Sequence, residues 1–191
     1  MKVLKAEELS RDLEYELFGN LRDTVAVEIG RILDTARGLA ILDVLSGLAE
    51  VAAEMRYCPP TILADDLLEI TEGRHPVIEQ SSACDAFVPN DSKLDAAQDS
   101  NRRIAILTGP NMAGKSTYIR QTALIVLLAQ VGSWVPAQAA HIGVTDRIFT
   151  RIGSGDDISR GASTFMVEMN EIANILNNAT AKSLVILDEV G

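Results

Sequence analysis

This sequence has few cysteines and lacks a signal-peptide pattern, the two features that would indicate a secreted protein. Cysteine occurs twice, as Cys58 and Cys84, which is too few for the disulfide framework of a small secreted protein. The N-terminal stretch MKVLKAEELSRDLEYELF has no apolar centre of the kind that signal peptides carry. We therefore expect a reducing, cytoplasmic setting.

Long apolar runs are also missing. The longest strongly apolar run, ALIVLLA, covers residues 123–129 and is far too short to cross a bilayer. Hydrophobic residues make up 47% of the 191 and charged residues 23%, which is enough apolar material for one sizeable core. The composition predicts a globular protein with no membrane partner.

Basic residues are scarce and are not clustered. Counts of Lys and Arg against Asp and Glu are 7 and 11 in residues 1–57, 2 and 9 in residues 58–101, and 8 and 7 in residues 102–191. The net charge of -10 therefore comes from the first hundred residues. Surfaces that neutralise nucleic-acid phosphates carry clustered Lys and Arg. We do not expect this chain to bind DNA well by itself.

The first part of the chain has almost nothing to interrupt a helix. No proline occurs between Leu4 and Arg56, and apolar residues recur there at helical spacing. More than fifty residues is long for an ordinary globular helix, so the pattern predicts one long packed helix or two in succession. Gly30, Gly38 and Gly47 are possible breaks, and the sequence does not choose among them.

Two successive prolines, Pro59 and Pro60, end the helical region. Residues 61–101 are typical of short strands and turns, with LLEITEGRHPVIEQ extended and VPNDSKLDAAQDSN a polar loop. From residue 103 the pattern becomes strand, loop, helix, further short segments, a helix over 165–178 and a final strand. This alternation predicts an α/β layer with a largely parallel sheet.

A glycine-bracketed loop lies at the centre of this second part. The stretch GPNMAGKS, from Gly109 to Ser116, has the spacing Gly, four residues, Gly-Lys-Ser. Glycines let backbone N–H groups approach phosphate oxygens, and the following helix directs its positive N-terminus to the same anion. Lys115 would reach the β- and γ-phosphates, and the Ser116 hydroxyl would bind Mg²⁺. Because RIAILT before the loop is β-rich and YIRQTALIVLLAQVG after it is helix-like, we interpret the loop as a phosphate-binding one.

The end of the chain supplies two acids. SLVILDEVG contains a continuous apolar run typical of a central parallel strand that is buried on both faces. Such a strand would deliver Asp188 and Glu189 to the sheet edge where ligands of α/β proteins bind. Asp188 suits the Mg²⁺ shell, and Glu189 suits the base that activates an attacking water. Together with the loop, these residues predict a Mg²⁺-dependent nucleotide hydrolase.

These stretches resemble the ATPase core of the MutS family of DNA mismatch repair proteins, and the bacterial type most closely. The resemblance rests on TGPNMAGKSTYIRQTALIVLLAQVGSWVPA, TRIGSGDDISRGASTFMVEMNEIANIL and LVILDEVG. Upstream, GRHPVIEQ is similar to the family's entry into its nucleotide domain, and the helical region is similar to its lever. The resemblance implies a helical lever and core segment over residues 1–57 and an ABC-like P-loop NTPase domain over residues 58–191.

The resemblance also implies site residues. Phe87 falls where the family stacks an aromatic ring on adenine, with Val88 beside the base, although a lone Phe is more often a core residue. Ser163 falls where the family offers a hydroxyl to the nucleotide of the opposite subunit, although it also suits a helix N-cap. Asn111, Lys115 and Glu189 correspond to catalytic positions, and Ser116 and Asp188 to metal ligands. The nucleotide contacts correspond to the whole loop: Gly109, Pro110, Asn111, Met112, Ala113, Gly114, Lys115, Ser116 and Thr117.

The sequence departs from the family in several places. Ala113 stands where many members have glycine, and the family continues beyond Gly191 with Arg-Gly-Thr and further elements. No Phe-x-Glu mismatch-reading wedge occurs. We therefore expect a fragment that is cut off after the Walker B strand. The intact protein would use ATP and Mg²⁺, form a homodimer, bind mismatched double-stranded DNA through regions not in this sequence, act with a factor such as MutL, and associate with the nucleoid.

Two alternatives stay open at this point. One is another ABC-like DNA-repair ATPase, although the Leu-Ser-Gly-Gly type of signature is absent from the sequence. The other is a nucleotide-binding remnant that does not hydrolyse, since the isolated chain would leave sheet edges unpaired. His75 has no evident charge partner and is interpreted as structural.

Overall fold

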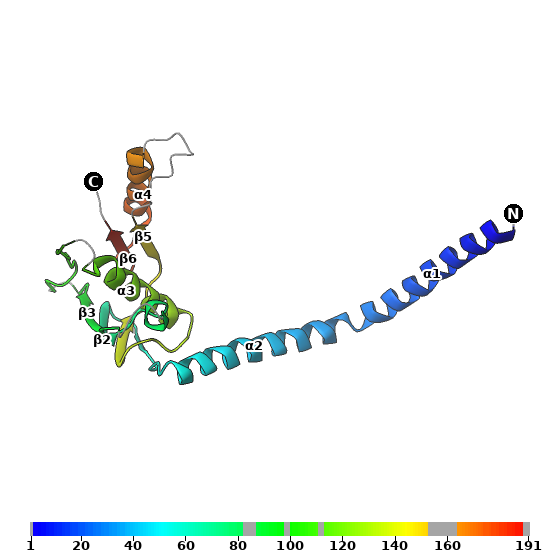
Figure 1. The fold of residues 1–191 in the computed structure, drawn as a ribbon, viewed down its shortest axis with the longest axis horizontal. Coiled ribbons are helices and arrows are strands. Elements are labelled where there is room, and N and C mark those ends of the chain that lie inside the picture. Colours follow the sequence, from blue (N-terminus) through cyan, green and yellow to red (C-terminus); the bar gives the residue numbers. More distant parts are fainter. Residues whose placement is uncertain (1, 82–86, 98–99, 111–112, 153–163, 189–191) are drawn as a thin grey trace. The chain divides into compact units, whose positions relative to one another are not determined.

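The computed structural model describes residues 2–81, 87–97, 100–110, 113–152 and 164–188 (Figure 1). The chain divides into two compact units, residues 1–47 and residues 48–191.

The N-terminal unit is helical, as the spacing of apolar residues predicts. Helix α1 spans Lys2–Val27, and helix α2 begins at Ile29 and runs to Glu54. The expectation of two helices in succession is confirmed, but the break falls at Glu28 and not at a glycine. The N–H of Glu28 donates to the carbonyl oxygen of Val25, 3.0 Å away, three residues back instead of four. Val25, Val27 and Ile29 are β-branched, which weakens helix propensity around this point.

Large apolar side chains of these helices are exposed in this chain, although the sequence predicted a packed helix. Leu13 is 56% exposed, Phe18 66% and Leu42 65%. Among the described residues, no helix is both long enough and apolar enough to cross a bilayer.

The described strands of the second unit form two sheets. The first has four strands in the order β1-β4-β2-β3, formed by Thr61–Leu63, Ala139–Gly143, Leu67–Gly73 and Asn90–Asp95 respectively. Strand β1 is parallel to β4, whereas β2 is antiparallel to both β4 and β3. The second sheet pairs β5, Ile148–Ile152, in parallel with β6, Leu184–Asp188. A short 3-10 turn, η1, covers Ile78–Gln80.

The predicted fold class, an ABC-like P-loop NTPase domain with a largely parallel sheet, is wrong. The larger sheet is mixed, and two of its three strand pairings are antiparallel. Residues 103–108 form no strand, and Ile104 and Ile106 are 81% and 84% exposed. A strand needs a hydrogen-bonded neighbour to form, and apolar composition does not supply one.

Two further strand predictions need correction. Residues 90–95, predicted to be a polar loop, form the edge strand β3, which alternates exposed residues with the buried Ser92. Strand β6 is parallel to its neighbour as predicted, but it is not buried on both faces. Val185 is 38% exposed and Leu187 49%, while Ile186 is buried.

Helix α3, Lys115–Gln130, forms the centre of the hydrophobic core. Ile125 and Val126 are fully buried and pack with Ile70 and Ile142 of the larger sheet. The helix contacts both β2 and β6, so it joins the two sheets. The helix predicted after the glycine loop is thereby confirmed.

Helix α4, Thr164–Asn178, confirms the second helix predicted in this part of the chain. It contacts β5, where the buried Arg151 forms an ion pair with Glu168 of the helix. The Nε atom of Arg151 also lies 3.2 Å from a carboxylate oxygen of Glu171. A buried guanidinium with two carboxylates on one helix face fixes that face toward the strand.

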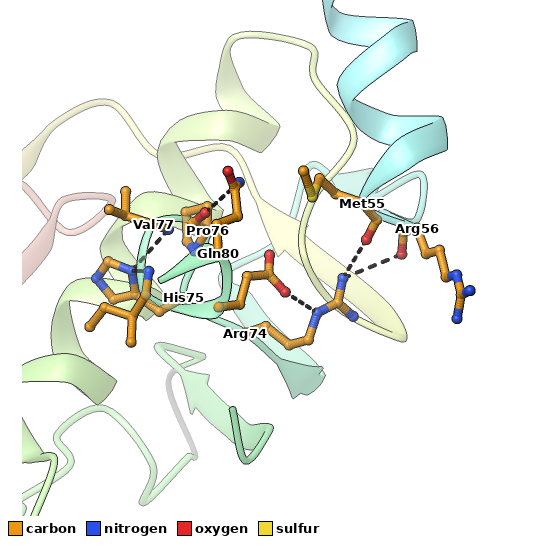
Figure 2. Close-up of polar contacts among 9 residues, drawn as sticks. Met55, Arg56, Arg74, His75, Pro76, Val77 and Gln80 are labelled. Atoms are coloured by element: carbon orange, nitrogen blue, oxygen red, sulfur yellow. Dashed lines mark hydrogen bonds and ion pairs between the residues drawn. The ribbon is translucent and has the colours of Figure 1, made fainter. Parts of the chain in front are cut away.

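The end of helix α2 is held by Arg74, as Figure 2 shows. The guanidinium donates to the carbonyl oxygen of Met55 at 2.9 Å, and to a carboxylate oxygen of Glu79 at 2.6 Å. It also lies over the Tyr57 ring, 5.9 Å from its centroid. The last carbonyl groups of a helix have no partner within the helix, and a cation there also favours the helix dipole. Arg74 therefore anchors the end of α2 to the turn after β2.

His75 organises the same turn (Figure 2). Its ring is buried, and Nδ1 accepts the backbone N–H groups of Val77 and Ile78, each 3.3 Å away. Desolvation by burial lowers the pKa of His75 below its ordinary value. The neutral imidazole therefore acts as a hydrogen-bond acceptor in the folded chain.

We expect His75 to make stability depend on pH. Because its folded pKa is lowered, the unfolded chain takes up a proton as the pH falls below about 6.5 while the folded chain does not, so the free energy of unfolding decreases there. The variant His75→Asn keeps an acceptor oxygen but cannot titrate. Urea unfolding at about pH 7 and about pH 5.5 should show a smaller loss for this variant than for the wild type.

The exposed His141 on β4 gives the matched control. The variant His141→Asn makes the same substitution at an exposed position and reports any general effect of replacing histidine with asparagine. An equal loss of stability in the wild type and in His75→Asn would contradict the role of His75.

Candidate functional site

The glycine loop has the backbone conformation that its glycines allow. Gly109 has φ of 153° and Gly114 has φ of 86°, both in the region that L side chains rarely adopt. Nothing within 4 Å would meet a Cβ atom built on Gly114, so its conformation, and not a lack of space, calls for glycine. Asn111 and Met112, which the sequence assigns to this loop, lie outside the described residues.

The loop leads directly into the N-terminus of helix α3. Gly114 is the N-cap and provides no side-chain cap, and the N–H of Tyr118 makes an i to i-4 bond to its carbonyl oxygen at 2.9 Å. The N–H groups of Lys115, Ser116 and Thr117 come before that bond, so they have no acceptor within the helix. Together with the helix dipole, these donors suit an anion.

Lys115 extends over the loop. Its ammonium group donates to the carbonyl oxygens of Gly109 at 2.7 Å and Pro110 at 2.9 Å. The positive charge is thereby held close to the start of the glycine loop. A phosphate bound there would offer the ammonium stronger, charged acceptors than these two carbonyls.

A pocket of about 590 Å³ lies beside the loop. This volume is within the range of sites that hold small molecules. One wall comes from the segment before and at the start of β3, and the other from the glycine loop and the first turn of α3. The lining residues are Phe87, Val88, Asn90, Leu107, Thr108, Ala113, Gly114, Lys115, Thr117 and Tyr118.

The two predicted base contacts are at this pocket. Phe87 is half-buried and Val88 is 75% exposed. The side-chain amide of Asn90 donates to the carbonyl oxygen of Val88 at 3.0 Å, which holds this segment against the start of β3. An aromatic ring and an aliphatic side chain at the wall of an open pocket offer a stacking surface for a flat, apolar ring system.

Asp188 is the last residue of β6, as the sequence predicts, and its side chain is 12% exposed. Its carboxylate lies 3.6 Å from the guanidinium of Arg120 on α3, a distance typical of an ion pair and not of a direct hydrogen bond. This contact brings the end of β6 to helix α3, whose first turn carries Ser116.

The donors of Ser116 and Asp188 fit a magnesium ion. A hydroxyl and a carboxylate oxygen are the hard donors that Mg²⁺ prefers. In the described part of the chain, no group of three or more His, Cys, Asp or Glu side chains could hold a metal. Mg²⁺ commonly takes one or two protein ligands and completes its shell with water and substrate phosphates, so two donors suffice.

The structure brings together part of the predicted site. Phe87, Val88, Ala113, Gly114, Lys115 and Thr117 line one pocket, and Gly109 and Pro110 join it through the ammonium of Lys115. Ser116 and Asp188 are not in the lining of this pocket. Ser163 and Glu189, like Asn111 and Met112, lie outside the described residues.

Sequence reasoning missed four lining residues: Asn90, Leu107, Thr108 and Tyr118. Leu107 and Thr108 directly precede the glycine loop, and Asn90 is two residues after Val88, so proximity in sequence was an available signal. Tyr118 is one turn into α3, where a ring four residues after Gly114 lies on the same face as the loop.

Known proteins resemble this chain over nearly its whole length. It is 59% identical over 189 residues to the DNA mismatch repair protein MutS of Acetivibrio thermocellus, covering 99% of this chain and 21% of that protein. The MutS of Ruminiclostridium cellulolyticum is 58% identical with the same coverage. The MutS of Lachnoclostridium phytofermentans is 56% identical over 190 residues, which are 100% of this chain and 20% of that protein. The chain thus spans about a fifth of the length of these relatives.

A protein-family comparison agrees with these relatives. Residues 105–191 match the family described as MutS domain V. This assignment, with the mixed sheet, replaces the fold class that the sequence predicted. The matched range begins just before the glycine loop and includes helices α3 and α4 and strands β4 to β6. The chain therefore belongs to the MutS family of DNA mismatch repair proteins.

Proposed function

We propose that this chain is the nucleotide-binding part of a DNA mismatch repair protein, with ATP as its ligand. The observation that carries the proposal is the pocket whose two walls are the Phe87–Val88 segment and the glycine loop with the start of α3. One wall suits a base and the other suits phosphates. The similarity of the chain to proteins named MutS supports the role in mismatch repair.

The chemistry of the phosphate side follows from the residues at the loop. The N–H groups of Lys115, Ser116 and Thr117 would donate to phosphate oxygens, and the Lys115 ammonium would neutralise charge there. Ser116 and Asp188 would hold Mg²⁺, which supplies further positive charge to the phosphates. Their oxygens fit that ion, and the contact between α3 and β6 supports their acting together.

We further propose that the intact protein hydrolyses ATP. Glu189 directly follows Asp188 in the sequence and would accept a proton from the attacking water. Asn111 would donate from its side-chain amide near the terminal phosphate, and Ser163 would contact the nucleotide of a second subunit in a homodimer. In this proposal the nucleotide state controls how the dimer holds mismatched DNA and engages a factor such as MutL, and the protein works in the bacterial cytoplasm at the nucleoid.

Replacing Lys115 should weaken phosphate binding. In the MutS-family protein that contains this chain, we expect Lys115→Ala to lower ATP affinity by about tenfold to a hundredfold, because a charged hydrogen bond contributes roughly 1.5–3 kcal/mol. Isothermal titration calorimetry measures the change. Lys182→Ala removes a surface lysine distant in sequence from the loop and should leave the affinity within about twofold. An unaltered affinity of Lys115→Ala would contradict the assignment of the loop.

Replacing Asp188 should reduce the contribution of magnesium to binding. We expect the ATP affinity of the wild type to fall when Mg²⁺ is removed with a chelator, and we expect a smaller fall in Asp188→Asn, because an amide oxygen is a weaker ligand than a carboxylate. The readout is binding with and without Mg²⁺, not turnover. Asp43→Asn, on an exposed position of α2, should respond to Mg²⁺ as the wild type does. An identical response of Asp188→Asn and wild type would remove Asp188 from the metal site.

A further inference from the structure

The two walls of the pocket come from segments that are distant in sequence, so something must fix their separation. The base-side wall, Phe87 and Val88, leads into the edge strand β3 at Asn90, and among the described residues β3 pairs with β2 alone. The phosphate-side wall belongs to the N-terminal turn of α3. An edge strand has backbone hydrogen bonds to a neighbour on one side, so side-chain contacts add to what holds it against the helix layer.

A group of hydroxyls joins β3 to α3 through Tyr118, which also lines the pocket. The buried Ser92 of β3 donates from its hydroxyl to the phenol oxygen of Tyr118, 2.8 Å away. The phenol in turn donates to the carbonyl oxygen of Asp91 at 3.0 Å. Thr122, one turn further along α3 and also buried, has its hydroxyl oxygen 3.2 Å from that of Ser92. Two hydrogen bonds thus join one tyrosine to two successive residues of β3.

Tyr118 is also bound to the phosphate side. Its backbone N–H donates to the carbonyl oxygen of Gly114 at 2.9 Å, and both residues line the pocket. Tyr118 therefore connects two parts of the site. Its backbone binds the end of the glycine loop, and its phenol binds strand β3. On β3, the next residue toward the base side is Asn90, whose amide holds the Val88 carbonyl at 3.0 Å.

The contact between Tyr118 and β3 consists of hydrogen bonds, and this determines how it holds the strand. Apolar packing has no preferred direction, whereas the hydrogen bonds of the Tyr118 phenol have a defined length and direction. Asp91, beside Ser92, attaches β3 to β2 as well. Its carboxylate accepts a hydrogen bond from the backbone N–H of Glu72 at 2.8 Å. Strand β3 is thus fixed relative to both β2 and α3.

We propose that Tyr118, with Ser92, is a positioning residue that sets the distance between the base-side and phosphate-side walls of the pocket. The proposal rests on the proposed function, in which a nucleotide spans both walls. Tyr118 lets the two walls act together on one ligand, so that a nucleoside triphosphate binds more tightly than a bare polyphosphate. It would act on recognition of the base through the position of Phe87 and Val88, and not through contact with the phosphates.

The test is Tyr118→Phe in the full MutS-family protein that contains this chain, with ATP and inorganic tripolyphosphate as probes. Calorimetry in the presence of Mg²⁺ gives both affinities. The variant keeps the ring and the backbone bond to Gly114 but loses both phenol hydrogen bonds. We expect ATP affinity to fall by about five- to thirtyfold, from two hydrogen bonds of ordinary strength, and tripolyphosphate affinity to stay within about twofold.

Two further variants make the result specific. Tyr15→Phe removes the phenol of an exposed tyrosine on α1 and should change neither affinity. Ser92→Ala should reproduce part of the loss for ATP, and the double variant Tyr118→Phe with Ser92→Ala should lose less than the sum of the two single changes, because both act through one contact.

The outcomes separate this proposal from the function on which it rests. A wild-type protein that binds neither probe would overturn the proposed function, and this inference with it. A wild type that binds both, together with a Tyr118→Phe variant that weakens both equally or neither, would leave the proposed function in place and overturn the positioning role.

Discussion

The burial of one face of helix α3 is the constraint on which the rest of the second unit depends. Ile125 and Val126 are fully buried, and Ala129 is 3% exposed, so the helix cannot rotate without exposing its apolar face to water. That face determines where the N-terminus of α3 lies, and with it the glycine loop. It also directs Tyr118 and Thr122 toward β3, and Arg120 toward the end of β6.

The mixed sheet supplies the surface against which α3 packs, and glycine permits the close contacts there. A Cβ atom on Gly73 of β2 would lie 2.8 Å from the side-chain amide nitrogen of Gln121 on α3. At the same end of β2, Arg74 donates to the carbonyl oxygens of Met55 and Arg56, which directly follow α2. The end of β2 is therefore attached both to helix α3, through Gly73, and to the residues that follow α2, through Arg74.

The parts of the fold that the sequence predicts are those with a clear local period. Helices α3 and α4 and strand β6 follow from apolar spacing and length. The direction of strand pairing could not be predicted, because an apolar strand has the same pattern in a parallel and an antiparallel sheet. The polar edge strand β3 was missed for a related reason, since only Ser92 of its polar residues is buried. At the site, the motif of the glycine loop predicts a phosphate-binding segment. The assignment of Phe87 to the nucleotide site depended on the family resemblance. The hydrogen bonds of Tyr118 to β3 are found in the structure alone.

The most direct measurement is amide hydrogen exchange of the full MutS-family protein containing this chain, with and without ATP and Mg²⁺. A ligand that spans the pocket should slow exchange at two separate segments, residues 113–118 of the loop and helix start and residues 87–92 leading into β3. We expect protection at both segments at the same nucleotide concentration. Protection at the loop alone, or at neither segment, would contradict a single pocket that binds base and phosphates together.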